Sequence, residues 1–282
     1  MGYAAEALAL LQALAAGAAL PRVRGLHLPP PPRADDPRGE FAALELDDGT
    51  LGLSYVLLGD TLAGLSRQVG RFALAGRDAL DVARSYASAD PLERTVGFSA
   101  VNALTRWLFD RAGFAPPRSG DSIGLLDPLP GETVGMIGYF APLVPRIVAR
   151  GARVRVVELR ADLVGETDGV RVTLDAAELA GCDKVLATGT LLLNDTLETM
   201  LQHCRHARRL ALVGPSVGCP PDPLFARGVT LLGGSWVTDS AAYVVALKAG
   251  ESTGAFAWKY ALTAAEYPGW DALLARAAAR RG

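Results

Sequence analysis

Apolar and polar positions follow two different patterns along this chain of 282 residues. In its second half, short continuous apolar runs are separated by segments with helical spacing, which is typical of parallel strands buried on both faces of a sheet. The predicted strands are Thr133–Ile137, Arg153–Leu159, Lys184–Ala187, Arg209–Val213 and Val229–Leu232, and the predicted helices are Pro142–Ala149, Asn194–Cys204 and Ser240–Lys248. This half is therefore predicted to be an α/β domain with a mostly parallel sheet and helices on both faces.

The first half has strands first and most of its helices afterwards. A helix is predicted over residues 3–16, then strands at Val23–Leu28, Phe41–Leu46 and Thr50–Leu57, then helices at Asp78–Ala87 and Pro91–Asp110. The sequence Asp47-Asp48-Gly49 between the last two strands is a strong hairpin signal. Asp90 followed by Pro91 is typical of a helix N-terminus. This order of elements predicts a small α+β unit.

A segment rich in proline and glycine, from Gly113 to Gly131, separates the two patterns. Such segments commonly connect domains because they continue neither a helix nor a strand. We therefore expect two domains, residues 1–115 and residues 116–282. A second proline-rich stretch, from Pro29 to Pro37, is predicted to be a stiff surface loop.

Composition narrows the class of protein. Half of the residues are hydrophobic, 21% are charged and the formal net charge is −2, so no nucleic-acid partner is expected. No apolar run reaches the length of about 18 residues that a membrane span requires, so no membrane partner is expected either. Cys182, Cys204 and Cys219 are too few and too scattered for a disulfide framework. These features favour a cytoplasmic protein.

The first strand and turn of the second half are similar to those of nucleotide-binding domains. A strand leads to Gly138, and Glu158 follows the next strand about 20 residues later, where Rossmann domains hold an acid for a ribose. The second and third positions of the dinucleotide glycine motif, however, are Phe140 and Leu143. A side chain at the second position obstructs the approach of a pyrophosphate. The sequence therefore predicts a Rossmann-like scaffold without its usual dinucleotide.

Polar and small residues follow several of the predicted strands, at the edge where open α/β sheets bind ligands. They are Gly138-Tyr139, Glu158, Thr188-Gly189-Thr190, Gly214-Pro215-Ser216 and Gly233-Gly234. Backbone N–H groups at such turns can bind a polar ligand, whereas the alternative is that the glycines only reverse the chain. Four turns of this kind at corresponding positions favour a shared pocket.

Individual polar residues near these turns allow two interpretations each. Glu158 is either a hydrogen-bond acceptor or general base for a ligand, or a solvated acid at a strand end. Asn194 or Asp195, with Glu198 in capping-box spacing, either caps the following helix or contacts the ligand directly, and both can hold because a helix N-terminus beside the site also supplies N–H donors. Asp239 is expected to cap the helix that begins at Ser240.

A metal site is a second candidate. His203, Cys204 and His206 lie close together in sequence, and their side chains suit divalent transition metals such as zinc, copper or nickel. The same residues are typical of a basic helix C-terminus, which the helix dipole favours. The sequence leaves the metal undetermined, and it contains no zinc-finger, P-loop or serine-hydrolase motif.

Taken together, these segments resemble the heavy-metal chelation family of Rossmann-like proteins. The resemblance is carried by Gly138–Val144, Glu158-Leu159, Thr188–Leu197, Gly214–Ser216, Leu224–Val229, Gly233 and Asp239, and in the first half by Gly52–Tyr55 and Ala100–Leu104. The first half is similar to the partner domain of that family, which resembles the N-terminal domain of enolase. The chain departs from the family at Leu191-Leu192, where a hydroxyl-bearing residue often follows the Thr-Gly-Thr core.

The resemblance implies a site between the two domains. The ligand- or cofactor-binding residues that it carries over are Gly138, Tyr139, Thr188, Gly189, Thr190, Asn194, Asp195, Gly214 and Pro215, and the residues expected to act on or orient the ligand are Glu158, Ser216 and Asn102. Asn102 lies on an apolar helical stretch, where an unpaired amide costs roughly 1–3 kcal/mol, so it is either a structural tie or a site residue. Lys259 is either a surface lysine or the only nearby cation of the pocket.

The leading hypothesis is a protein that binds a small molecule or metal chelate, as an enzyme of heavy-metal chelator, metallophore or pterin-like metabolism. One alternative is a non-catalytic carrier, with a metal or metal complex held by the His203 cluster or by Glu158 and Asp195. Another alternative is an enzyme that uses S-adenosylmethionine or a nucleotide. The sequence leaves open the substrate, the reaction, whether the protein is catalytic and whether it forms a homo-oligomer.

Overall fold

The larger of two sheets has the strand order β11-β10-β9-β8-β4-β5-β7-β6 in a computed structural model that describes residues 2–31, 40–120 and 125–280. The pairs that join β10, β9, β8, β4, β5 and β7 are parallel, whereas β11 and β6 are antiparallel edge strands. The strands are β4 (Thr133–Ile137), β5 (Arg153–Val157), β6 (Gly165–Thr167), β7 (Val170–Thr173), β8 (Lys184–Thr188), β9 (Arg209–Val213), β10 (Leu231–Val237) and β11 (Ala257–Thr263). The prediction of a mostly parallel sheet in an α/β fold is confirmed.

Helices flank this sheet on both faces, as the apolar strands predicted. They are α5 (Val144–Val148), α6 (Leu197–His203), α7 (Asp222–Phe225), α8 (Ser240–Ala249) and α9 (Trp270–Ala279). One face packs Val134, Met136 and Val154 against Val144 and Ile147 of α5. The other face contributes Val185, Leu212 and Leu262 to a core that also contains residues of the first half.

The first half forms a three-stranded antiparallel sheet with its own helices. Its elements are α1 (Tyr3–Gly17), β1 (Val23–His27), β2 (Phe41–Leu46), β3 (Leu51–Tyr55), α2 (Thr61–Gln68), α3 (Ala79–Ala83) and α4 (Pro91–Arg111). The predicted hairpin joins β2 to β3, with Gly49 at φ +88°. Asp90 caps α4 by accepting a hydrogen bond from the Leu92 N–H at 2.8 Å, as its sequence position predicted.

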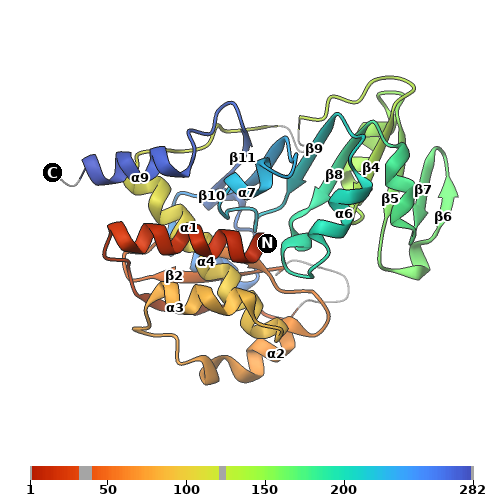
Figure 1. Cartoon of the computed structure of the whole chain (residues 1–282). Coiled ribbons are helices and arrows are strands. Elements are labelled where there is room, and N and C mark those ends of the chain that lie inside the picture. The colour runs from red at the N-terminus through yellow and green to blue at the C-terminus, as the bar shows by residue number, and fades with distance from the viewer. Residues whose placement is uncertain (1, 32–39, 121–124, 281–282) are drawn as a thin grey trace.

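One apolar core connects the two halves. Helices α1 and α9, from opposite ends of the chain, lie side by side with each other and with α4 (Figure 1). Across the small sheet, Ala43 and Leu53 face Tyr243 and Leu247 of α8, so that a helix of the second half covers a sheet of the first. The division into residues 1–115 and 116–282 stays a prediction.

The contact between β3 and α4 depends on a glycine. A Cβ atom at Gly52 would lie 2.1 Å from the Ser99 carbonyl oxygen and 2.3 Å from the Ala103 nitrogen. Such distances are far inside van der Waals contact, so only glycine lets the strand and helix backbones approach this closely. Through this contact, the segments Gly52–Tyr55 and Ala100–Leu104 pack directly against each other.

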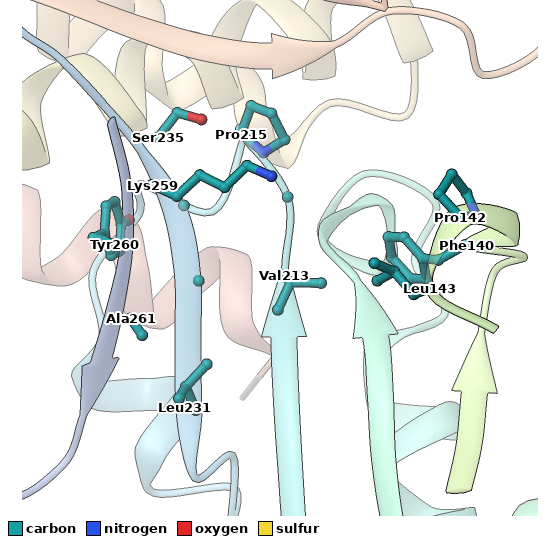
Figure 2. Close-up of a pocket in the computed structure, with 13 residues that line it drawn as sticks. Phe140, Pro142, Leu143, Val213, Pro215, Leu231, Ser235, Lys259, Tyr260 and Ala261 are labelled. Atoms are coloured by element: carbon teal, nitrogen blue, oxygen red, sulfur yellow. The ribbon is translucent and has the colours of Figure 1, made fainter. Parts of the chain in front are cut away.

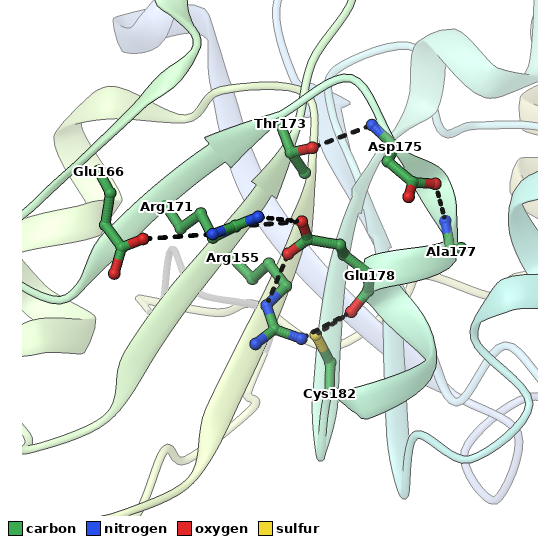
Figure 3. Close-up of polar contacts among 8 residues, drawn as sticks. All are labelled: Arg155, Glu166, Arg171, Thr173, Asp175, Ala177, Glu178 and Cys182. Carbon is green, nitrogen blue, oxygen red and sulfur yellow. Dashed lines mark hydrogen bonds and ion pairs between the residues drawn. The ribbon is translucent and has the colours of Figure 1, made fainter.

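An ion-pair network fixes the segment that leads into β8. The Glu178 carboxylate pairs with Arg155 of β5 at 3.3 Å and with Arg171 of β7 at 2.7 Å (Figure 3). Cys182 lies beneath this network, and burial raises the pKa of its thiol to about 11. The network therefore holds the segment that precedes β8 against β5 and β7.

Two sequence expectations differ from the structure. Strand β10 runs from Leu231 to Val237 rather than ending at Leu232, because the unpredicted strand β11 pairs with all of it. Gly233-Gly234 consequently lies inside a strand and does not form a turn beyond it. Helices α2, α7 and α9 and strands β6, β7 and β11 were likewise not predicted.

Most of the proline-rich loop from Pro29 to Pro37 lies outside the described residues. In the part of the chain that the structure describes, none of the helices combines the length and apolar character needed to cross a bilayer.

Candidate functional site

The direction of chain progression across the sheet reverses at β4. This strand pairs with β5 on one side and with β8 on the other, so the turns that follow β4 and β8 diverge from each other. In α/β sheets such a switch point opens a crevice at the carboxyl ends of the strands, where ligands bind. Gly138 and Thr188 lie at this point, one after each strand.

A cavity of about 460 Å³ occupies this crevice and is roofed by the first half of the chain. Its volume lies in the range of sites for small molecules, which is about 300–1,000 Å³. We call it the interdomain cavity. Its walls include Gly138, Tyr139, Glu158, Thr188, Gly189, Thr190, Asn194, Gly214, Pro215 and Ser216 from the second half, and its roof consists of Glu40, Phe41, Tyr55 and Leu58.

The structure therefore brings together ten of the twelve site residues that the family resemblance carried over. Asn102 and Asp195 do not line this cavity. The turns after β4, β5, β8 and β9 converge on it because all four strands are parallel and end at the same edge. Three of the four glycine turns on which the expectation of a shared pocket rested thus line one cavity, whereas Gly233-Gly234 does not, and the role of these residues in binding stays a prediction.

Glu158 is held by the backbone at the mouth of the crevice. Its Oε2 accepts a hydrogen bond from the Tyr139 N–H at 2.9 Å, and its Oε1 accepts one from the Leu159 N–H at 2.7 Å. The carboxylate therefore has a fixed orientation while its side chain remains half-buried. Glu158 is thus a strand-end acid that also lines the cavity, and its role toward a ligand stays a prediction.

Gly138 makes this arrangement possible. Its φ is +82°, a conformation that L side chains rarely adopt, and its N–H donates to the Val157 carbonyl at 2.9 Å. The turn brings the Tyr139 N–H to Glu158. On the opposite wall, the Thr190 N–H and hydroxyl both donate to the Thr188 hydroxyl, at 3.3 and 3.2 Å.

Two polar residues of the roof were not identified from the sequence. Burial raises the pKa of the Glu40 carboxyl. Burial, and then the charges of Glu40 and Glu158, raise the pKa of the Tyr55 hydroxyl, so it keeps its proton. Tyr55 belongs to the segment Gly52–Tyr55 noted above, but Glu40 precedes β2 without any motif.

The interdomain cavity has an acidic character. Among the described residues that line it there is no lysine, arginine or histidine, whereas Glu40 and Glu158 lie on opposite halves. Arg160, two residues beyond Glu158, is paired with Asp162 at 2.6 Å. The side chains of the cavity therefore present acceptors and negative charge to a ligand.

Asn102 is buried behind the wall and ties it to the first half. Its Nδ2 donates to the carbonyl oxygens of Leu53 at 2.6 Å and of Ser216 at 2.8 Å. Its Oδ1 has no hydrogen-bond partner among the described residues. The structural interpretation of Asn102 therefore holds, and the amide acts on the cavity through the position of Ser216.

The expected caps of α6 are wrong. The helix begins at Leu197, and its N-cap, Thr196, makes no side-chain cap hydrogen bond. Asn194 Oδ1 instead accepts from the Thr196 N–H at 3.2 Å and hydroxyl at 2.6 Å, which closes a loop before the helix. Asp195 points away and pairs with Arg94, and Glu198 pairs with Arg227 at 2.9 Å. By contrast, Asp239 caps α8 as expected, through the Ala242 N–H at 2.9 Å.

The cluster at the end of α6 does not suit a metal ion. Cys204 is buried, and burial raises the pKa of its thiol to about 12, which disfavours the thiolate that a metal requires. His206, by contrast, is exposed. No group of three or more His, Cys, Asp or Glu side chains within residues 2–31, 40–120 and 125–280 is arranged to hold a metal ion.

Two family profiles that carry the same description match the two halves of the chain. A family profile described as "Putative heavy-metal chelation" matches residues 121–266, and a second profile with the same description matches residues 39–105. An uncharacterised protein of Methanocaldococcus jannaschii is 28% identical over 173 residues, which is 60% of this chain and 64% of that protein. This chain therefore matches less than two thirds of that curated relative.

Two solved structures share the fold over nearly the whole chain. A protein of unknown function from the first family, from Desulfitobacterium hafniense DCB-2, has a TM-score of 0.67 and 20% identity, covering 93% of this chain and 100% of its own. A second, from Pyrococcus horikoshii, has a TM-score of 0.62 and 20% identity, covering 92% of this chain and 97% of its own. At this identity, the likeness establishes the fold alone.

Proposed function

The chain belongs to the family described as "Putative heavy-metal chelation", and from this premise we propose that it binds an amine-bearing or otherwise cationic small molecule of chelator metabolism in the interdomain cavity. The ligand is a chelator or its positively charged metal complex. In this proposal, residues 1–115 and 116–282 are two domains that each contribute one carboxylate to the site.

The observation that carries the proposal is that Glu40 of the first half and Glu158 of the second half line one cavity, with no basic side chain among the described residues that line it. Two carboxylates attract ammonium groups or cationic complexes and repel phosphates and carboxylates. The resulting difference in binding free energy favours cationic ligands over anionic ones. The backbone hydrogen bonds also disfavour a nucleotide, because the Tyr139 and Leu159 N–H groups already donate to Glu158 rather than to a phosphate.

The lining residues have distinct roles in this proposal. Glu158, oriented by two backbone N–H groups, anchors an amine of the ligand. The hydroxyls of Thr188, Thr190 and Ser216 add hydrogen bonds along one wall, and Tyr55 donates from the roof because its raised pKa keeps it protonated. Asn102 is a positioning residue that holds Ser216 in place.

We further propose that the protein acts as an enzyme on the bound chelator. Glu40 is the residue suited to accept a proton, since it lines the cavity and burial raises the pKa of its carboxyl above the ordinary glutamate value. Proton transfer is the step that these residues support.

Thermal denaturation of the full chain tests the binding proposal. The probes are triethylenetetramine, the substitution-inert hexaamminecobalt cation, S-adenosylmethionine, a pterin, ATP and inorganic phosphate. A ligand that binds only the native state raises the melting temperature. We expect stabilisation by triethylenetetramine or hexaamminecobalt, and none by ATP or phosphate.

Matched variants locate the effect. Glu158→Gln and Glu40→Gln remove one charge each from the cavity, whereas Glu166→Gln removes a charge from an exposed pair on β6. Stabilisation should be reduced in the first two variants and kept in the third. Stabilisation by ATP that survives Glu158→Gln would contradict the proposal, and a response to S-adenosylmethionine alone would favour an enzyme that uses this cofactor.

A further inference from the structure

A second cavity lies beside the interdomain cavity. It has a volume of about 320 Å³ and shares Phe140, Val213, Gly214 and Pro215 with the first. We call it the sheet-face slot, because strands β9, β10 and β11 form its floor (Figure 2). The two cavities are therefore neighbours with common walls.

The floor of the sheet-face slot is apolar and is lined by short side chains. Val213, Gly233 and Ala261 stand in register on three adjacent strands, so one row across the floor carries only small or short side chains. Leu231 continues the floor toward the other end of β10. On the side of β4, the wall is formed by Phe140, Pro142 and Leu143 (Figure 2). A flat floor beside an aromatic side chain suits a planar ring.

The charge of the sheet-face slot is opposite to that of the interdomain cavity. Lys259 is the charged residue of its lining, and its side chain extends over the rim toward Pro215 (Figure 2). Among the described residues, no carboxylate pairs with this exposed ammonium group. Ser235, the register partner of Lys259 on β10, adds a hydroxyl at the same end.

A protein strand does not suit this surface. The outer edge of β11 is already occupied, because the Ser119 N–H donates to the Lys259 carbonyl at 2.9 Å and the Ala261 N–H donates to the Pro117 carbonyl at 3.2 Å. No unpaired edge is therefore left at these positions for strand addition. The enclosed volume is that of a small-molecule site.

We propose that the sheet-face slot binds a planar aromatic group that carries an anionic substituent, with the ring on the floor and the anion at Lys259. Resting on the proposed function, we assign this group to the same molecule whose amine occupies the interdomain cavity. The ligand is then a zwitterionic aromatic chelator, whose amine contacts Glu158 and whose carboxylate or sulfonate contacts Lys259. The shared wall at Phe140 and Pro215 allows one molecule to reach both cavities.

Anilinonaphthalenesulfonate is a direct probe of the sheet-face slot, since it joins planar aromatic rings to one sulfonate and fluoresces when it leaves water. Its uncharged analogue N-phenylnaphthylamine has the same rings without the anion. We expect saturable binding of the sulfonate to the full chain, weakened by added salt. Lys259→Gln should weaken it about fivefold and leave the binding of the uncharged analogue unchanged.

Two further variants complete the test. Ala261→Phe fills the floor and should abolish the binding of both probes, whereas Lys248→Gln removes an exposed charge from α8 and should change neither. Equal affinity of the sulfonate for wild type and Lys259→Gln would overturn the proposal, and this comparison holds even if Ala261→Phe fails to fold. The amine site is tested separately by thermal shifts of Glu40→Gln and Glu158→Gln, so failure of one proposal is distinguishable from failure of the other.

Discussion

The side-chain amide of Asn102 donates a hydrogen bond to the backbone carbonyl of Ser216 at 2.8 Å, across 114 positions of sequence. The same nitrogen donates to Leu53 of β3 at 2.6 Å. One buried amide therefore holds helix α4, strand β3 and the turn after β9 together. Because β3 carries Tyr55 into the roof and the turn carries Ser216 into the wall, this contact sets the distance between them.

Asn102→Asp should destabilise the protein by roughly 2–3 kcal/mol. The substituted carboxylate has the same shape but donates no hydrogen bond when ionised, and it would face two carbonyl oxygens. Urea denaturation of the full chain measures the change in the free energy of unfolding. Gln12→Glu makes a similar amide-to-acid change at an exposed position of α1 and serves as the control. A loss no greater than that of the control would contradict the role assigned to Asn102.

Gly52→Ala should destabilise the protein by about 3 kcal/mol or more, because the added methyl group overlaps the backbone of α4 and neither element can move alone. Gly25→Ala, in β1, is the matched substitution, since a Cβ atom there meets no atom within 4 Å. This control should change stability by less than about 1 kcal/mol. Thermal and urea denaturation would measure the free energy of unfolding of both variants. Similar stabilities of Gly52→Ala and Gly25→Ala would refute the close packing of β3 on α4.

Glu132 forms a buried ion pair with Lys184 at 2.8 Å and also binds Arg208. Burial alone would raise the pKa of the Glu132 carboxyl, but the hydrogen bonds from Lys184 and the Leu129 N–H outweigh it and lower that pKa. A carboxyl with a lowered folded-state pKa stabilises the fold above its unfolded-state pKa, and this contribution is lost as pH falls through the folded-state value. The pair should therefore stabilise the protein at neutral pH and fail in acid.

Glu132→Gln should cost roughly 3 kcal/mol at neutral pH, because it leaves the Lys184 charge buried without its partner. The difference from wild type should shrink below about pH 4, where the wild-type carboxyl also becomes neutral. Urea denaturation at a series of pH values measures both effects. Glu166→Gln, in an exposed pair with Arg171, should cost less than about 0.5 kcal/mol. A difference between Glu132→Gln and wild type that does not depend on pH would contradict this assignment.

Binding of hexaamminecobalt should weaken as the pH falls, and the loss should begin above the pH range in which exposed glutamates titrate. The reason is that burial raises the pKa of Glu40, and a neutral carboxyl no longer attracts a cation. The charge of the probe does not change with pH, so the profile reports the protein. Glu40→Gln should weaken binding about fivefold at neutral pH and flatten this part of the profile, as calorimetric titration would measure. An unchanged profile in that variant would exclude Glu40 as the titrating group.

Local patterns were enough to identify much of the second half of the site. Strand-end residues can be read from the sequence because parallel strands deliver their carboxyl ends to one edge, as Gly138, Glu158, Thr188 and Gly214 show. The roof could not be found in this way. Glu40 and Tyr55 reach the cavity only through the packing of the small sheet on α4 and α8, which no local pattern of either residue encodes.

The errors have a similar origin. The end of β10 was placed too early because Gly233-Gly234 is typical of a turn, whereas pairing with β11 over seven residues keeps the strand extended. Asp195 has the residue type of a helix cap, but its ion pair with Arg94 of the first half draws it away from the cavity. In both cases a partner distant in sequence outweighed a local preference.

By itself, the sequence determined the α/β class, the order of most strands and helices, and the edge of the sheet at which polar residues collect, because periodicity and turn chemistry act over a few neighbouring residues. Only the tertiary structure decided that Glu40 and Glu158 line one cavity, that Asn102 holds Ser216, and that Lys259 stands over a separate apolar floor. These relationships join residues far apart in sequence. They arise from packing of the two halves around a common core, which depends on all of their contacts together.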